Sequence, residues 1–233
     1  MSQPRSKSQS GDIKYAAWAG IVQLPAGFIV LIIAGSFPHV FPVWDEPPSE
    51  IVSFMVNNAP RVVIGCFGNA LAFLLMIWFV VGLTEMIRSR TTSPRPVFTQ
   101  LITPCAVATV STFTASTVLW LATLLGALGH PVAMSTSMVH YTFITSILFW
   151  PFAELPAALM MIAAGVATLQ VPDFPTWLAK SAFPVAALNF AISFAVIAKN
   201  GWLAPLNLTM IVPMGLIFGW MTAAGVVMLR AER

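Results

Sequence analysis

The sequence predicts an all-α integral membrane protein, a helical bundle with six transmembrane helices. Apolar residues make up 58% of its 233 positions, and Asp, Glu, Lys and Arg together only 8%, whereas about a quarter of the residues in ordinary soluble domains are charged. Six apolar segments are long enough to cross a hydrocarbon core of about 30 Å, which takes about 20 helical residues. Strands of a membrane β-barrel would instead show strict alternation over about 9–11 residues, and the sequence has no such pattern.

The six helices are expected where these apolar segments lie, near residues 13–35, 60–86, 98–128, 138–169, 177–198 and 203–229. Turn-forming stretches such as SRTTSPRP, VPDFP and KNGW separate them. Residues 1–12 are polar and lack an apolar core, which predicts a disordered cytoplasmic tail, so residues 13–230 form one transmembrane domain. In the longest loop, the stretch SEIVSFMVNN predicts a short interfacial helix capped by Ser49.

The positions of the basic residues predict the orientation. Two of the eleven lie on one side of the expected membrane, and nine lie on the other: Arg5, Lys7, Lys14, Arg88, Arg90, Arg95, Lys180, Arg230 and Arg233. Since cytoplasmic loops are enriched in Lys and Arg, both termini should be cytoplasmic, in a bacterial inner membrane. The net charge of +3 comes from scattered residues rather than from one basic stripe, so nucleic acid is not an expected partner.

The sequence carries no signature of a soluble enzyme. It has no GxGxxG, Walker loop, GxSxG or HExxH motif, which gives no reason to expect a cofactor. His39, His130 and His140 have no Cys or carboxylate at ligand spacing, so no metal site is expected. Cys66 and Cys105 fall at different depths in the membrane, too far apart for a disulfide.

One carboxylate lies in the middle of the expected fourth helix. The stretch FWPFAELPAALMM places Glu154 close to the centre of residues 138–169, and therefore within a few ångströms of the bilayer midplane. A carboxylate exposed to lipid at that depth costs at least a few kcal/mol. We therefore expect Glu154 to face the bundle interior and to lie within hydrogen-bond reach of a polar side chain, with Asn189 or Gln23 as the best candidates.

Other polar side chains share this depth. Gln23 and Asn189 lie near the centres of their helices, as do Thr112 and Thr114 in the hydroxyl-rich run TVSTFTAST, while Asn69 lies about 7.5 Å further out. Four prolines interrupt three of the helices near the same depth and free backbone carbonyls, which are tolerated where they are buried or line a cavity. The polar side chains of Gln23, Asn69, Thr112, Thr114 and Asn189 are therefore the expected ligand-binding groups around Glu154.

His140 is a further ligand-binding candidate on the expected fourth helix. It lies 14 residues before Glu154, on nearly the same helix face but about 21 Å away along the axis. Any relay between the two side chains would therefore need water and the intervening hydroxyl groups.

The whole layout resembles uncharacterised bacterial families of six-helix membrane proteins, of the kind described as domains of unknown function. The resemblance lies in the short basic tail, the six helices, the long first outer loop and the carboxylate on the fourth helix. It implies no activity.

Three hypotheses about function therefore stay open. In the first, the protein binds or transports a small, mostly apolar molecule in a polar pocket around Glu154, because an intramembrane carboxylate is by default a functional candidate. In the second, Glu154 is the catalytic general acid of an intramembrane enzyme, such as a cyclase or isomerase. In the third, the chain is a structural subunit that binds a membrane protein or a second copy of itself, and its polar residues only hold helices together.

Overall fold

The computed structural model describes residues 7–33, 46–91, 96–130, 133–197 and 208–232. Every regular element in these residues is helical, which confirms that the fold is all-α. The elements are α1 (Lys7–Ile33), α2 (Pro48–Asn57), α3 (Ala59–Arg90), α4 (Pro96–Leu128), α5 (Thr136–Thr168), α6 (Thr176–Ile192), the 3₁₀ helix η1 (Ser193–Ile197) and α7 (Leu208–Ala231).

Five helices, α1, α3, α4, α5 and α7, are long and apolar enough to cross a membrane. The remaining expected span, residues 177–198, is divided between the 17-residue helix α6 and the five residues of η1. At the N-terminus, α1 begins at Lys7 rather than near residue 13, while residues 1–6 of the expected tail lie outside the described residues. The same holds for residues 203–207, at the start of the last expected helix.

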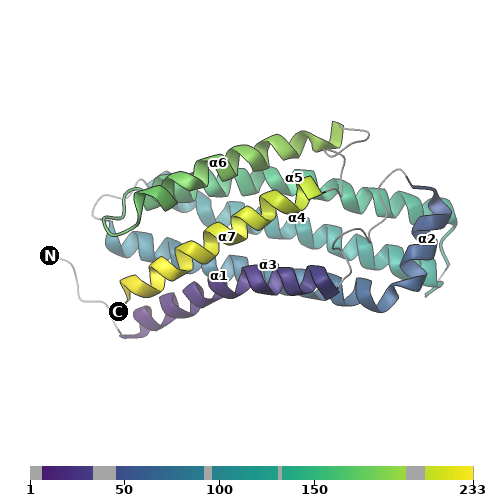
Figure 1. Ribbon diagram of the computed structural model, residues 1–233, viewed down its shortest axis with the longest axis horizontal. Coiled ribbons are helices and arrows are strands. Elements are labelled where there is room, and N and C mark those ends of the chain that lie inside the picture. Colours follow the sequence, from purple (N-terminus) through teal and green to yellow (C-terminus); the bar gives the residue numbers. More distant parts are fainter. Residues whose placement is uncertain (1–6, 34–45, 92–95, 131–132, 198–207, 233) are drawn as a thin grey trace.

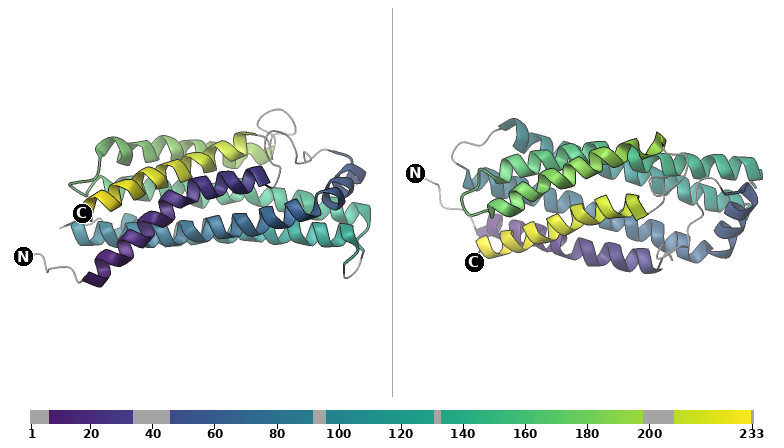
Figure 2. Two further views of the ribbon diagram at one scale, coloured as in Figure 1. Left: turned by 60° about the horizontal axis from the view of Figure 1, so that its bottom comes forward. Right: turned by 45° about the horizontal axis from the view of Figure 1, so that its top comes forward.

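The six longest helices form a closed ring in chain order. Each packs against the next, from α1 to α3, α4, α5, α6 and α7, and α7 returns to pack against α1. Figures 1 and 2 show these helices lying side by side along the long axis of the molecule. Contacts of α7 with α3 and α5 cross the interior of the ring. Side chains buried on α1, α5 and α6 are therefore held within one bundle.

Small residues allow α1 to approach both of its neighbours in the ring. A Cβ atom added to Gly82 of α3 would lie 2.1 Å from the Cβ of Ala16, and one added to Gly225 of α7 would lie 2.6 Å from the carbonyl oxygen of Ala17. Glycine removes both clashes, as at many close helix crossings in membranes. The contact of Gly225 with Ala17 also puts the start of α1 and the end of α7 at the same end of the bundle (Figure 1).

The opposite end is covered by α2. Helices α3, α4 and α5 have 32, 33 and 33 residues, so at 1.5 Å per residue each is about 50 Å long, well beyond a hydrocarbon core of about 30 Å. Ile51 and Met55 of α2 pack against the start of α3, the end of α4 and the start of α5. The short helix expected here is confirmed, but the expected cap is wrong, because Ser49 lies inside α2 and Pro47 precedes its first residue without a side-chain cap.

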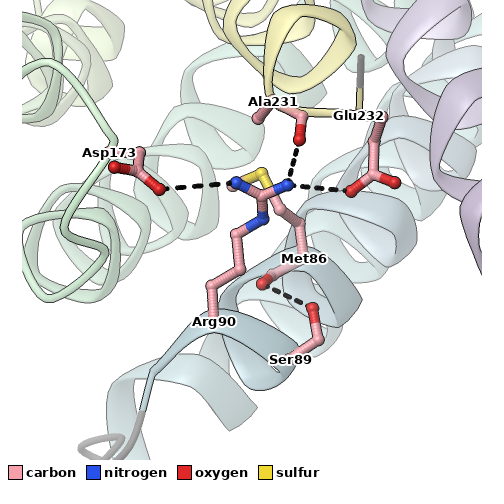
Figure 3. A network of polar contacts seen from close by, with 6 residues as sticks. All are labelled: Met86, Ser89, Arg90, Asp173, Ala231 and Glu232. Carbon is pink, nitrogen blue, oxygen red and sulfur yellow. Dashed lines mark hydrogen bonds and ion pairs between the residues drawn. The ribbon is translucent and has the colours of Figure 1, made fainter. Parts of the chain in front are cut away.

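An arginine ties three segments together at the end where α1 begins and α7 ends (Figure 3). One guanidinium nitrogen of Arg90 pairs with Asp173 at 3.7 Å. Another donates to the carboxylate of Glu232 at 3.1 Å and to the backbone oxygen of Ala231. The side chains of Arg90 and Glu232 are only 18% and 5% exposed, so the contact fixes the end of α7 against α3 and the turn between α5 and α6.

Candidate functional site

Glu154 lies in the middle of α5 and is 1% exposed. Neither carboxylate oxygen has a hydrogen-bond partner among the described residues. A buried polar group without a partner costs about 1–3 kcal/mol of stability. Most polar groups buried in proteins are satisfied, so this side chain is an exception that calls for a physical reason.

The backbone around Glu154 is interrupted by two prolines but remains helical. Pro151 and Pro156 lie inside α5, and each leaves the carbonyl four residues earlier without its helical donor. One turn before Glu154, the indole of Trp150 donates to the hydroxyl of Ser116 on α4 at 3.0 Å. That hydroxyl in turn donates to the backbone oxygen of Ser146 at 2.8 Å. Helix α4 therefore anchors α5 directly before its first proline.

Asn189 of α6 approaches the same level from the neighbouring helix. It is 0% exposed, and its amide nitrogen donates to the backbone oxygen of Val185 at 2.7 Å, while its Oδ1 has no partner among the described residues. Gly165 of α5 lies against Ala179 and Ala182 of the antiparallel α6. Counting along both helices from that contact puts Asn189 level with residue 157, about 4.5 Å along the axis from Glu154.

Gln23 is the third fully buried polar side chain. It is 0% exposed, and neither of its amide atoms has a partner in the described part of the chain. It shares a face of α1 with Gly20 and Gly27, three and four residues away. These glycines lie against Phe79 of α3 and Phe218 of α7. Because α1 packs on α3 and α7 whereas α5 packs mainly on α4 and α6, Gln23 is buried on a helix that is not adjacent to α5.

The expected environment of Glu154 is therefore confirmed in one respect and wrong in another. Its burial is confirmed, and Gln23 and Asn189 are both buried as well. The expected hydrogen bond from Glu154 to Asn189 or Gln23 is wrong, because its carboxylate bonds to neither of them. All three side chains instead keep hydrogen-bonding atoms unused by the described residues.

The other candidate residues lie outside this group of three. Thr112 is half-buried and Thr114 is exposed, and each hydroxyl donates to a backbone oxygen of its own helix, at 2.8 Å and 2.7 Å. Asn69 is half-buried on α3, beside Gly68. His140 is half-buried near the start of α5, with a buried Nε2 that has no partner among the described residues. Its distance from Glu154 along the helix is about 21 Å.

A row of aromatic rings that the sequence pattern did not predict borders the site. Phe73 of α3 stacks on Phe113 of α4 with 4.4 Å between ring centroids, and Phe113 meets the edge of Trp150 of α5 at 5.1 Å. Phe73 also contacts Phe218 of α7 at 6.2 Å. Trp150 lies four residues before Glu154, so the two share a face of α5. The sequence signal was Trp150 itself, one turn from the carboxylate.

The side chains of Glu154, Asn189 and Gln23 can form hydrogen bonds and exchange protons in apolar surroundings. Within the described ranges, no three His, Cys, Asp or Glu side chains come together as metal ligands would. Cys66 and Cys105 are both unpaired, and they lie in separate clusters of buried side chains. No family model, curated protein or solved structure matches this chain.

Proposed function

We propose that the chain crosses a bacterial inner membrane six times. Five helices have the length and apolar composition of spans. The sixth would be α6 together with η1, which add 17 and five residues and continue the ring between α5 and α7. Since about 20 helical residues cross a bilayer core, these 22 residues suffice.

Both ends of the chain would be cytoplasmic. The support is the distribution of basic residues, since cytoplasmic segments are enriched in them. Arg61 lies at the start of α3, near the end that α2 covers. The end where α1 begins and α7 ends carries Lys14, Arg88, Arg90, Lys180 and Arg230. A cysteine introduced at the exposed Ser49 of α2 should then react with a membrane-impermeant thiol reagent on intact cells or spheroplasts. Protection there, with reaction only after the membrane is opened, would reverse the orientation.

The function proposed for the ring interior is binding or transport of a small, mostly apolar molecule that carries one polar group. A single observation carries the proposal: Glu154 is 1% exposed, and both of its oxygens are unpartnered among the described residues. A fold that keeps such a group bears its desolvation cost. A ligand donor would return the missing hydrogen bond.

The surroundings match the two parts of such a molecule. The Oδ1 atom of Asn189 has no partner among the described residues and lies about 4.5 Å from Glu154 along the helix axis. It offers a second acceptor for the polar group of the ligand. The aromatic rings of Phe113, Trp150 and Phe218 would contact its apolar body. Four prolines inside three of the helices allow local opening near the middle of the ring, as in transporters with interrupted helices: Pro25, Pro151, Pro156 and Pro213.

The test is an unbiased analysis of lipids and metabolites bound to the purified protein. The full chain, the Glu154→Gln variant and a control, Glu50→Gln on the exposed surface of α2, are purified in the same detergent and extracted for mass spectrometry. We expect one small molecule to accompany the wild type and the control, and to fall at least about tenfold in Glu154→Gln, the factor that one hydrogen bond to a buried polar group supplies.

Equal recovery from all three proteins would contradict binding at Glu154. If the Gln variant holds a precursor where the wild type holds its product, the second hypothesis applies, with Glu154 as a general acid.

A further inference from the structure

A second polar site lies on the outer face of the bundle, far from Glu154 along the chain. A cleft of about 310 Å³ opens between the last turns of α3 and the first turns of α4. Its rim carries Glu85 and Arg88 from α3 and Gln100 from α4. The hydroxyl groups of Thr84 and Thr103 meet across the two helices at 3.5 Å, and both residues line the cleft.

The exposed surface of α3 changes character at this cleft. Leu74, Trp78 and Val81 follow one another at spacings of three and four residues and are about half exposed, which is the pattern of a helix face turned toward lipid. Glu85 and Arg88 continue the same stripe at the same spacing. The stripe thus passes from apolar side chains to charged ones, as expected where a helix leaves the hydrocarbon core and enters the headgroup layer.

The two charged side chains on the rim, Glu85 and Arg88, do not form an ion pair with each other. No ion pair within 4.0 Å joins Glu85 to Arg88, and neither has another ion-pair partner in the described part of the chain. A carboxylate and a guanidinium three residues apart on one helix face present a negative and a positive group side by side. This is the complement of a ligand that carries a positive and a negative group close together.

We propose that the cleft binds the headgroup of a zwitterionic aminophospholipid. The phosphate would accept hydrogen bonds from Arg88 and Gln100, since a guanidinium is well suited to phosphate oxygens. The primary ammonium would donate to Glu85, and an acyl chain would lie along Val81, Trp78 and Leu74. A choline headgroup has no N–H to donate to Glu85, a glycerol headgroup has no positive charge, and free phosphate has neither an ammonium nor an acyl chain.

Native mass spectrometry of the full chain in detergent tests the proposal. Phosphatidylethanolamine, phosphatidylcholine and phosphatidylglycerol with identical acyl chains are titrated in turn, and the bound fraction is read for each. We expect one phosphatidylethanolamine to bind about tenfold more tightly than phosphatidylcholine, the factor expected for one charge-assisted hydrogen bond. Glu85→Gln should remove this preference, and Arg88→Gln should weaken the binding of both phosphatidylethanolamine and phosphatidylcholine.

Arg61→Gln, at the other end of the same helix, is the matched control and should bind as the wild type does. Helix content measured by circular dichroism shows that each variant is folded, and Glu85→Asp should keep part of the preference in case Glu85→Gln does not fold. Equal binding of the three lipids would overturn the proposal, as would a preference that survives in both Gln variants. Tighter binding of phosphatidylglycerol, or displacement of the lipid by millimolar inorganic phosphate, would also overturn it, because each indicates a site for anions alone.

Discussion

Replacing Glu154 with leucine is expected to make the protein more stable. Both carboxylate oxygens are buried without a partner among the described residues, so the folded state bears a desolvation cost that an apolar side chain of similar size would not. We expect Glu154→Leu to raise the free energy of unfolding by about 1–3 kcal/mol, the usual cost of an unsatisfied buried polar group. The thermal midpoint in detergent, followed by tryptophan fluorescence, is the measurement.

Glu154→Gln is the matched control for this prediction. Glutamine keeps a buried polar group at the same position, so it should not reproduce the gain in stability. A leucine variant that unfolds more easily than the wild type would mean that the carboxylate makes a stabilising bond within the protein. In that case the structural role would be favoured, with Glu154 holding helices together.

A gain in stability together with a loss of the bound molecule would fit a common pattern. Functional sites often keep groups that destabilise the fold, because activity requires them. The two effects can be separated, since leucine and glutamine should both lose the ligand while only leucine stabilises the fold.

The depth of Glu154 could be predicted from the sequence, because position along a helix follows directly from the residue count. Its partners could not, because depth does not say how a helix is rotated or which helices are its neighbours. In the ring, α1 packs between α3 and α7, so Gln23 shares the depth of Glu154 but lies on a helix that is not adjacent to α5. The expected hydrogen bond required a packing order that the sequence did not contain.

The threonines of α4 also show that depth alone does not say which way a side chain faces. Thr112 and Thr114 are two residues apart, which is about 200° around a helix, so both could not face one interior point. The structure leaves Thr114 exposed and bonded to its own helix. Here the helical period alone could have removed one candidate.

The contact of Arg90 with Glu232 was out of reach of any local pattern. The two residues are 142 positions apart in the chain, and their pairing depends on how α3 and α7 end at the same face of the bundle. By contrast, α2 could be predicted from the sequence, because its amphipathic pattern is contained within ten residues.

Binding at this site requires that a small apolar molecule can reach the carboxylate of Glu154 inside the folded bundle. Dicyclohexylcarbodiimide is a suitable probe, because it is small and apolar and adds to a protonated carboxyl group to give a stable N-acylurea without a leaving group. The exposed carboxylates, such as Glu50 on α2, lie outside the apolar interior into which this reagent partitions and should react poorly. Glu154 should therefore be modified first.

The most direct measurement is the intact mass of the folded protein in lipid nanodiscs after brief exposure to this reagent, followed by peptide mapping. We expect one adduct per chain, located on the peptide that contains Glu154, and no such adduct in Glu154→Gln. A folded wild-type protein that stays unmodified at Glu154, and is labelled there only after denaturation, would contradict this expectation.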